Sequence, residues 1–205
     1  MPLKIALIRE LAGPAKQWLA DVLEGTSLDD LAAHFSSVAS SVRDPSWTVS
    51  DEGREFLIAN DLAWLLRGSS LEELARVLVF IRALEVASDR RALAETWYLD
   101  AARSGRRAIL RALALAPRPK LHLDLAVLAA VSTEPSVFDA ICFENPYPAR
   151  FFDDACFDHM VGRATERRGS LERVLGLEGR RNEQLVRRAV ETALRTADEL
   201  KPSAD

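Results

Sequence analysis

Apolar residues recur at helical spacing along nearly the whole chain. Leu28, Leu31, Ala32 and Phe35, for example, occupy positions i, i+3, i+4 and i+7, which is typical of an amphipathic helix. Polar stretches with Gly, Pro or a capping Ser or Asp separate such segments. No run between turns is described better by period two than by period 3.6. The pattern therefore predicts an all-α protein.

The layout predicts helices that are joined by short loops. They include residues 3–11, 14–23, 56–65, 121–131 and 149–167, and a last amphipathic helix that ends at Leu200. Stacked antiparallel helix pairs, in a HEAT-like α-solenoid, and an irregular helical bundle both fit this layout. We expect residues 1–44 to form an N-terminal helical segment and residues 45–205 a helical domain, together one compact unit.

One predicted helix differs from the others because it is apolar on almost every side. It follows the sequence Ser70-Leu71-Glu72-Glu73 and carries Leu74 through Leu84. The spacing of Ser70 and Glu73 predicts a capping box, in which each side chain satisfies a free donor at the helix start. A helix that is apolar all round has neighbours on several sides, so we expect it at the centre of the fold. Further on, we expect Gly105 to end or kink the helix that Asp89 caps.

Composition narrows the class of protein. The chain has 205 residues and a net charge of −4, which argues against a nucleic-acid-binding protein. No apolar run approaches the ~20 residues of a membrane span, and no secretory signal is visible. We therefore expect a soluble, cytoplasmic protein. In that compartment Cys142 and Cys156 are expected to be thiols, although the sequence does not determine whether they pair.

The sequence Asn145-Pro146-Tyr147-Pro148 is not explained by helix packing. Two prolines two positions apart remove backbone donors and push the residues before them toward extended geometry. We expect a rigid corner that presents Tyr147, followed by a new helix from Ala149, with Asp153 and Asp154 in its first turn.

This corner resembles a known family. The run Asn145 to Phe152, then Phe157, His159-Met160-Val161 and Gly176-Leu177 to Arg181-Asn182, is similar to the C-terminal signature of EboA proteins. Where the family pattern has Trp-Asn-Gln-Met, this chain has Phe157-Asp158-His159-Met160. The resemblance implies a protein encoded in a bacterial gene cluster for making or moving a secondary metabolite. It supplies no catalytic residue to carry over.

Two groups of polar residues are candidates for a site. His122 and Asp124 lie in an otherwise apolar segment, where a polar side chain without a partner is costly. Either Asp124 pairs with an arginine, or both residues line a cavity.

The second group surrounds the corner and comprises Asn145, Tyr147, Arg150, Asp154, Asp158 and His159. Arg150, Asp154 and Asp158 are each four apart, so they form either an ion-pair ladder along one helix or part of a site. The predicted ligand-binding residues are Asn145, Tyr147, Arg150, Asp154 and His159. The catalytic candidates are His159, His122, Asp124 and Asp158.

No second motif joins these acids and histidines at the spacing of a metal site, and we expect neither metal nor cofactor. Basic clusters at Arg103-Arg106-Arg107-Arg111 and Arg163-Arg167-Arg168-Arg173 are either solvated helix faces or docking sites for an acidic partner or phosphate group.

Three hypotheses for the function remain. The first is an accessory protein that binds a small metabolite or a pathway enzyme in a groove between helices. The second is a small all-helical enzyme, of isomerase or cyclase type, that uses His122 or His159 with a carboxylate. The third is a protein–protein scaffold without a ligand. The sequence does not identify the metabolite, the reaction or the oligomeric state.

Overall fold

The structure is a computed structural model that describes residues 13–42 and 49–180. Helices dominate this part of the chain and no strand occurs in it, so the all-α prediction is confirmed. The predicted helix over residues 3–11 and the predicted last helix lie outside the described residues. Within the described residues, no helix combines the length and the apolar character needed to cross a membrane.

The α-helices follow one another with short connections. They are α2 (Gly13–Glu24), α3 (Leu28–Ser41), α4 (Asp51–Ala59), α5 (Leu71–Val86), α6 (Arg90–Asp100), α7 (Arg103–Ala112), α8 (Leu123–Ala130), α9 (Pro135–Cys142), α10 (Tyr147–Phe151) and α11 (Asp154–Glu166). Short 3₁₀ helices lie between them, namely η1 (Ala63–Leu66), η2 (Leu113–Leu115), η3 (Pro119–His122), η4 (Leu171–Arg173) and η5 (Glu178–Arg180).

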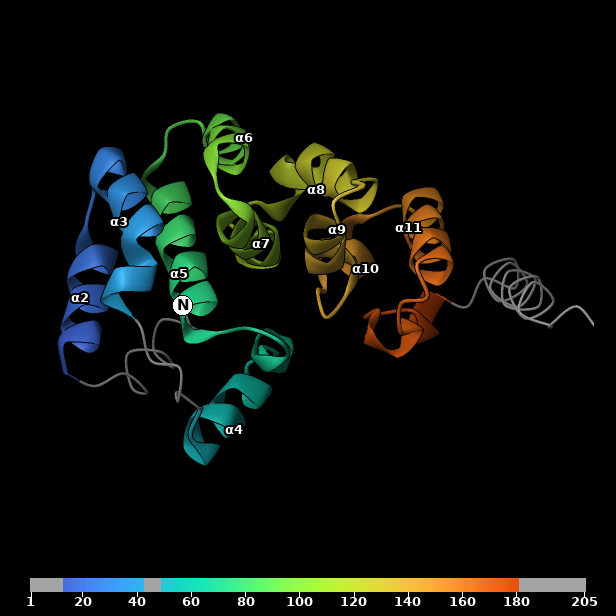
Figure 1. Cartoon of the computed structure of the whole chain (residues 1–205), viewed down its shortest axis with the longest axis horizontal. Coiled ribbons are helices and arrows are strands. Elements are labelled where there is room, and N and C mark those ends of the chain that lie inside the picture. Colours follow the sequence, from blue (N-terminus) through green and yellow to red (C-terminus); the bar gives the residue numbers. More distant parts are fainter. Residues whose placement is uncertain (1–12, 43–48, 181–205) are drawn as a thin grey trace, which may run out of the picture.

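The helices stack in a row (Figure 1). Helix α5 packs between α3 and α7, α7 packs on α9, and α9 contacts α11. Helices α6 and α8 lie beside this row and pack on α7 and α9, respectively. The buried apolar side chains of these helices form one core that is continuous from α2 to α11.

Helix α5 is the central element, as its apolar sequence predicts. Ser70 precedes the helix, and the side-chain oxygen of Ser70 accepts a hydrogen bond from the backbone N–H of Glu73. Its apolar side chains are buried on several faces, and Phe80 contacts the rings of Phe35 from α3 and Trp97 from α6. Helices α2 and α3 both pack directly onto α5. The division of the chain at residue 44 stays a prediction.

Two predicted helix boundaries are wrong. The helix expected over residues 56–65 is interrupted, because α4 ends at Ala59 and Asp61 adopts a left-handed conformation with φ of 57°. Gly105 does not end the helix that precedes it, since it lies within α7. A Cβ atom there would be 2.9 Å from the Cβ of Ala101 and 3.0 Å from the ring of Phe35, so close packing explains the glycine.

The single helix expected over residues 149–167 is also wrong. The corner forms the short helix α10, which ends where Phe152 takes an extended conformation. Asp153 then caps α11, accepting a hydrogen bond from the backbone N–H of Cys156 at 2.8 Å. Asp153 is therefore an N-cap and not a first-turn residue. The separation puts Arg150 on one helix and Asp154 on the next, so the ladder predicted along one helix does not form.

Candidate functional site

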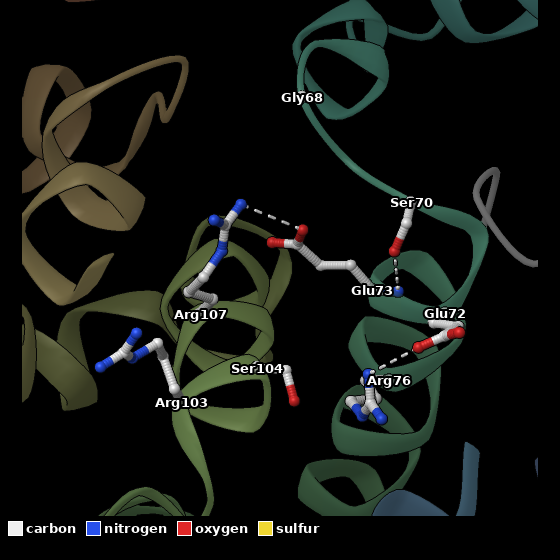
Figure 2. A pocket seen from close by; sticks show the side chains of 8 residues that line it. All are labelled: Gly68, Ser70, Glu72, Glu73, Arg76, Arg103, Ser104 and Arg107. Atoms are coloured by element: carbon white, nitrogen blue, oxygen red, sulfur yellow. Dashed lines mark hydrogen bonds and ion pairs between the residues drawn. The ribbon is translucent and has the colours of Figure 1, made fainter. Parts of the chain in front are cut away.

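A polar pocket lies between α5 and α7 (Figure 2). Its volume is about 390 Å³, within the usual range of small-molecule sites. All eight lining residues are polar or glycine, namely Gly68, Ser70, Glu72, Glu73, Arg76, Arg103, Ser104 and Arg107. Residues from the start of α5 form one wall, and residues from the start of α7 form the other. The lining therefore offers charged and hydroxyl groups to a ligand.

Glu73 joins the two walls. Its carboxylate does not return to cap Ser70, so only half of the predicted capping box forms. Instead Glu73 extends toward α7, where its Oε2 accepts a hydrogen bond from Arg107 at 3.3 Å (Figure 2). The residue is only 7% exposed. A carboxylate this deeply buried is stable only with compensating partners.

The other carboxylate oxygen of Glu73 has no hydrogen-bond partner. Its nearest cation is Arg111, whose Nε lies 3.7 Å away and also lacks a hydrogen-bond partner. Arg111 is 3% exposed and is anchored elsewhere, since it donates hydrogen bonds to the backbone oxygens of Trp64 and Arg67. Burial lowers the pKa of Arg111, and the charge of Glu73 opposes that shift. One buried acceptor and one buried donor thus face each other without a hydrogen bond.

The start of α7 is unusual in its charge. No side chain caps it and its first turn has no acidic residue, although Arg103 and Arg106 lie there and Arg107 follows. Positive side chains are unfavourable at the positive end of a helix. Glu134 partly compensates them, with oxygens 3.2 Å from Arg103 and 3.7 Å from Arg106. Arg103 and Ser104 remain on the pocket wall, so this helix end can bind an anion.

Asn145 and Tyr147 lie inside the fold, away from the α5–α7 pocket. The amide nitrogen of Asn145 donates to the backbone oxygens of Leu110 and Ala140, and its side-chain oxygen accepts from the N–H of Tyr147. The Tyr147 side chain is fully buried, and its hydroxyl donates to the backbone oxygen of Pro119 at 2.7 Å. These contacts connect the corner to α7, α9 and η3.

The remaining predicted residues near the corner lie on two helices, Arg150 on α10 and Asp154, Asp158 and His159 on α11. Arg150 pairs with Asp61 at 2.6 Å, whereas Asp154, which is 86% exposed, pairs with Arg180 at 3.3 Å. Asp158 is half-buried and His159 is exposed on α11. None of these residues lines the α5–α7 pocket. Their ligand-binding and catalytic roles stay predictions.

His122 and Asp124 lie in different environments. Asp124 is exposed and forms an ion pair with Arg91 at 2.6 Å, which is the arginine pairing that the sequence left open. His122 is 2% exposed, and its Nε2 has no hydrogen-bond partner. Burial lowers the pKa of His122, with a smaller opposing effect from Glu95.

We expect His122 to make the fold sensitive to acid. Its pKa is lower in the folded chain than the ordinary value near 6.5, so below that pH the unfolded chain binds a proton that the folded chain does not. Stability therefore falls as the pH falls. Urea unfolding is measured at pH 7.5 and at pH 5.0. Between these two pH values, His122→Gln should lose less free energy of unfolding than the unmodified chain. The control His159→Gln changes an exposed residue and should lose as much stability as the unmodified chain. Equal losses of stability in the unmodified chain and both variants would contradict the explanation.

Several arginines of the second basic cluster are used within the fold. Arg163 and Arg167 donate to backbone oxygens at the end of α8 and just after it, at Ala130, Ser132 and Thr133. Both lie over the ring of Phe138.

Sequence reasoning did not single out Arg180. It donates hydrogen bonds to the backbone oxygens of Ala149, Phe152 and Asp153. Arg180 therefore stabilises the end of α10. This contact explains in part why the sequence signature combines the proline corner with the Gly176-Leu177 segment that leads to Arg180.

Both cysteines are free in the structure. Burial raises the pKa of the Cys142 thiol to about 12, so it stays protonated at neutral pH. Among the described residues, no group of three or more His, Cys, Asp or Glu side chains could hold a metal ion.

Fold and site together define an all-helical protein with a charged pocket between stacked helices. A family model described as metabolite traffic protein EboA matches residues 3–199. The chain therefore belongs to the EboA family. No curated protein and no solved structure matches it.

Proposed function

We propose that this protein serves metabolite traffic in a bacterial secondary-metabolite pathway by binding a small polar metabolite in the α5–α7 pocket. The observation that carries the proposal is the pocket of about 390 Å³ with a wholly polar or glycine lining. Family membership supports a role in metabolite traffic, because the matching family model is described as a metabolite traffic protein. The protein holds the metabolite without forming a covalent bond to it.

The charges of the lining support binding of an anionic metabolite. Arg107 on α7 faces Glu73 on α5 across the pocket, whereas Arg76 and Glu72 both lie on α5. Three arginines and two glutamates leave the lining with one positive charge in excess, and Arg103 is also paired with Glu134 at 3.2 Å. Glu72 lies 3.7 Å from Arg76, and Glu73 is hydrogen-bonded to Arg107. The positive end of α7 adds to the same potential. An anion therefore meets a favourable field, and two serine hydroxyls offer further hydrogen bonds.

Retention of a metabolite by the purified protein tests this function. The chain is purified from cells that make the pathway's metabolite, then denatured, and the released small molecules are measured by mass spectrometry. We expect one anionic molecule in near-stoichiometric amount. Arg103→Glu should lose it, because this change reverses a charge on the pocket wall. Arg103 is 75% exposed along its side chain, so the variant is expected to fold.

A matched control has the same charge change elsewhere. Arg54→Glu alters an exposed arginine of α4 outside the pocket lining, and we expect it to retain the molecule like the unmodified chain. Equal retention by all three proteins, or no released molecule at all, would refute the proposed site. If incubation with the released molecule converts it to another compound, the protein is an enzyme and the carrier function is wrong.

A further inference from the structure

We propose that the outer face of helices α6 and α8 binds a second copy of this chain, so that the protein forms a weak symmetric dimer. Four exposed apolar side chains define this α6–α8 face, namely Leu99 near the end of α6, Leu121 in η3, Leu128 in α8 and Val131 directly after α8. Elsewhere in the described part of the chain, the large apolar residues with comparable exposure are Leu28 and Ile58. The inference does not depend on the proposed function.

Helices α6 and α8 run side by side in the same direction and form one surface. Arg91 at the start of α6 pairs with Asp124 at the start of α8 at 2.6 Å. Glu134, which follows α8, pairs at 3.2 Å with Arg103, which follows α6. The starts of the two helices therefore lie together, and so do their ends. Both helices lie outside the stacked row (Figure 1), so their exposed side chains belong to one face.

Helix α8 lacks a neighbour on its outer side. Asp124 is the single charged residue in its sequence, and its inner side is buried against the core. A helix that is apolar all round normally has neighbours on several sides, as α5 has. Leu128 of α8 is nevertheless 57% exposed. The sequence of α8 thus predicts a contact that the described part of the chain does not supply.

The charges at the two ends of the face indicate that a second copy makes this contact. Arg118 and Lys120 are exposed where the chain enters α8, and Asp100 is exposed where α6 ends. None of these three has an ion-pair partner within the residues that the structure describes. The C-terminal ends of both helices add negative potential beside Asp100. The face is therefore basic at one end and acidic at the other.

Such a face is complementary to itself. In a two-fold symmetric dimer the same patch of both copies forms the interface, and each contact between two different residues occurs twice. A two-fold axis across the face brings Lys120 of one copy against Asp100 of the other. The apolar side chains between the two ends then cover one another. This reciprocity favours a second copy over an unrelated protein, whose charges nothing in the face would match in this way.

The size of the face indicates a weak dimer. From Leu121 to Val131 the face is about 15 Å long, at the rise of a helical residue. Two helices of this length offer less than the about 800 Å² per partner of a standard interface. We therefore expect a dissociation constant on the order of 10 µM.

Sedimentation equilibrium of the full chain tests the dimer over protein concentrations from about 1 to 200 µM, because association follows mass action. Leu128→Asp should weaken the dimer at least about tenfold, since it places a charge in the apolar contact. The matched control is Ile58→Asp on α4, where the side chain is 56% exposed. We expect this control to dimerise like the unmodified chain. Circular dichroism shows whether each variant is folded.

A charge exchange tests the two-fold arrangement. Asp100→Lys and Lys120→Glu should each weaken the dimer about tenfold, because each sets like charges against one another at two symmetric places. The double variant with both changes should dimerise within about twofold of the unmodified chain. Recovery of this kind requires that the two residues meet across the interface.

The proposal is wrong if the unmodified chain stays monomeric at the highest concentration, which would leave the face to a different protein. It is also wrong if Leu128→Asp dimerises as tightly as the unmodified chain, or if Ile58→Asp weakens the dimer as strongly as Leu128→Asp does. A double variant that is as weak as the two single variants would show that the two ends do not meet and would overturn the symmetric arrangement.

Discussion

Replacement of Arg111 by methionine is expected to lower the free energy of unfolding by about 3–5 kcal/mol, the usual cost of breaking a buried ion pair. Arg111 is 3% exposed and lies beside the buried carboxylate of Glu73. Methionine fills a similar volume but leaves Glu73 with Arg107 as its remaining cation. It also removes two hydrogen bonds to the backbone oxygens of Trp64 and Arg67. Urea unfolding followed by circular dichroism measures the change.

A double substitution identifies the cause. If the cost arises from the buried carboxylate that has lost Arg111 and keeps only Arg107, Glu73→Gln in the Arg111→Met background should recover part of the lost stability, because the buried charge is removed. Arg54→Met on the surface of α4 should change stability by no more than about 0.5 kcal/mol. A loss below about 1 kcal/mol for Arg111→Met, or no recovery in the double variant, would contradict the importance of the buried pair.

This pair connects the stability of the fold to the pocket. Arg111 donates hydrogen bonds to the backbone oxygens of Trp64 in η1 and of Arg67, which follows η1, and it faces Glu73 at the start of α5. The position of Glu73 in the pocket therefore depends on contacts made outside it. A ligand that binds Glu73 should raise the unfolding temperature, because it stabilises only the folded chain.

The sequence predicted those features whose causes are local. Ser70 precedes α5 as a cap, since capping requires only neighbouring residues and a helical pattern behind them. The central position of α5 followed from its apolar faces. The breaks at Asp61 and Phe152 were not predicted, because the flanking sequence is equally compatible with a continuous helix.

The pocket could not be read from the sequence because its walls come from distant segments. Glu73 and Arg107 are separated by 34 positions. Each residue has a sufficient local explanation in the sequence, with Glu73 as half of a capping box and Arg107 as part of a basic helix face. Only the packing of α5 on α7 brings them together. One signal was present, namely a basic first turn without a cap in the segment that begins at Arg103.

The corner around Tyr147 shows the opposite difficulty. Its unusual sequence was interpreted as a site, yet the structure gives Asn145 and Tyr147 partners within the fold. A proline corner exposes backbone oxygens that need donors, and a buried corner needs side chains that reach them. An unusual run of residues can therefore arise from the requirements of a buried turn.

Tyr147→Ala is expected to destabilise the fold by about 3–5 kcal/mol, as for other buried aromatic residues. The side chain is fully buried and its ring centroid lies 4.8 Å from that of Phe151. Tyr147→Phe keeps the ring and removes only the hydrogen bond to Pro119, so it should cost about 0.5–1.5 kcal/mol. Both values are measured by urea unfolding.

The same two variants distinguish a structural tyrosine from a ligand-binding one. Because Tyr147 lies outside the α5–α7 pocket, Tyr147→Phe should retain the cellular metabolite like the unmodified chain while losing some stability. The opposite result, with unchanged stability and lost metabolite, would show that the hydroxyl contacts the ligand. It would place the binding site at the proline corner, as the sequence first indicated, and not between α5 and α7.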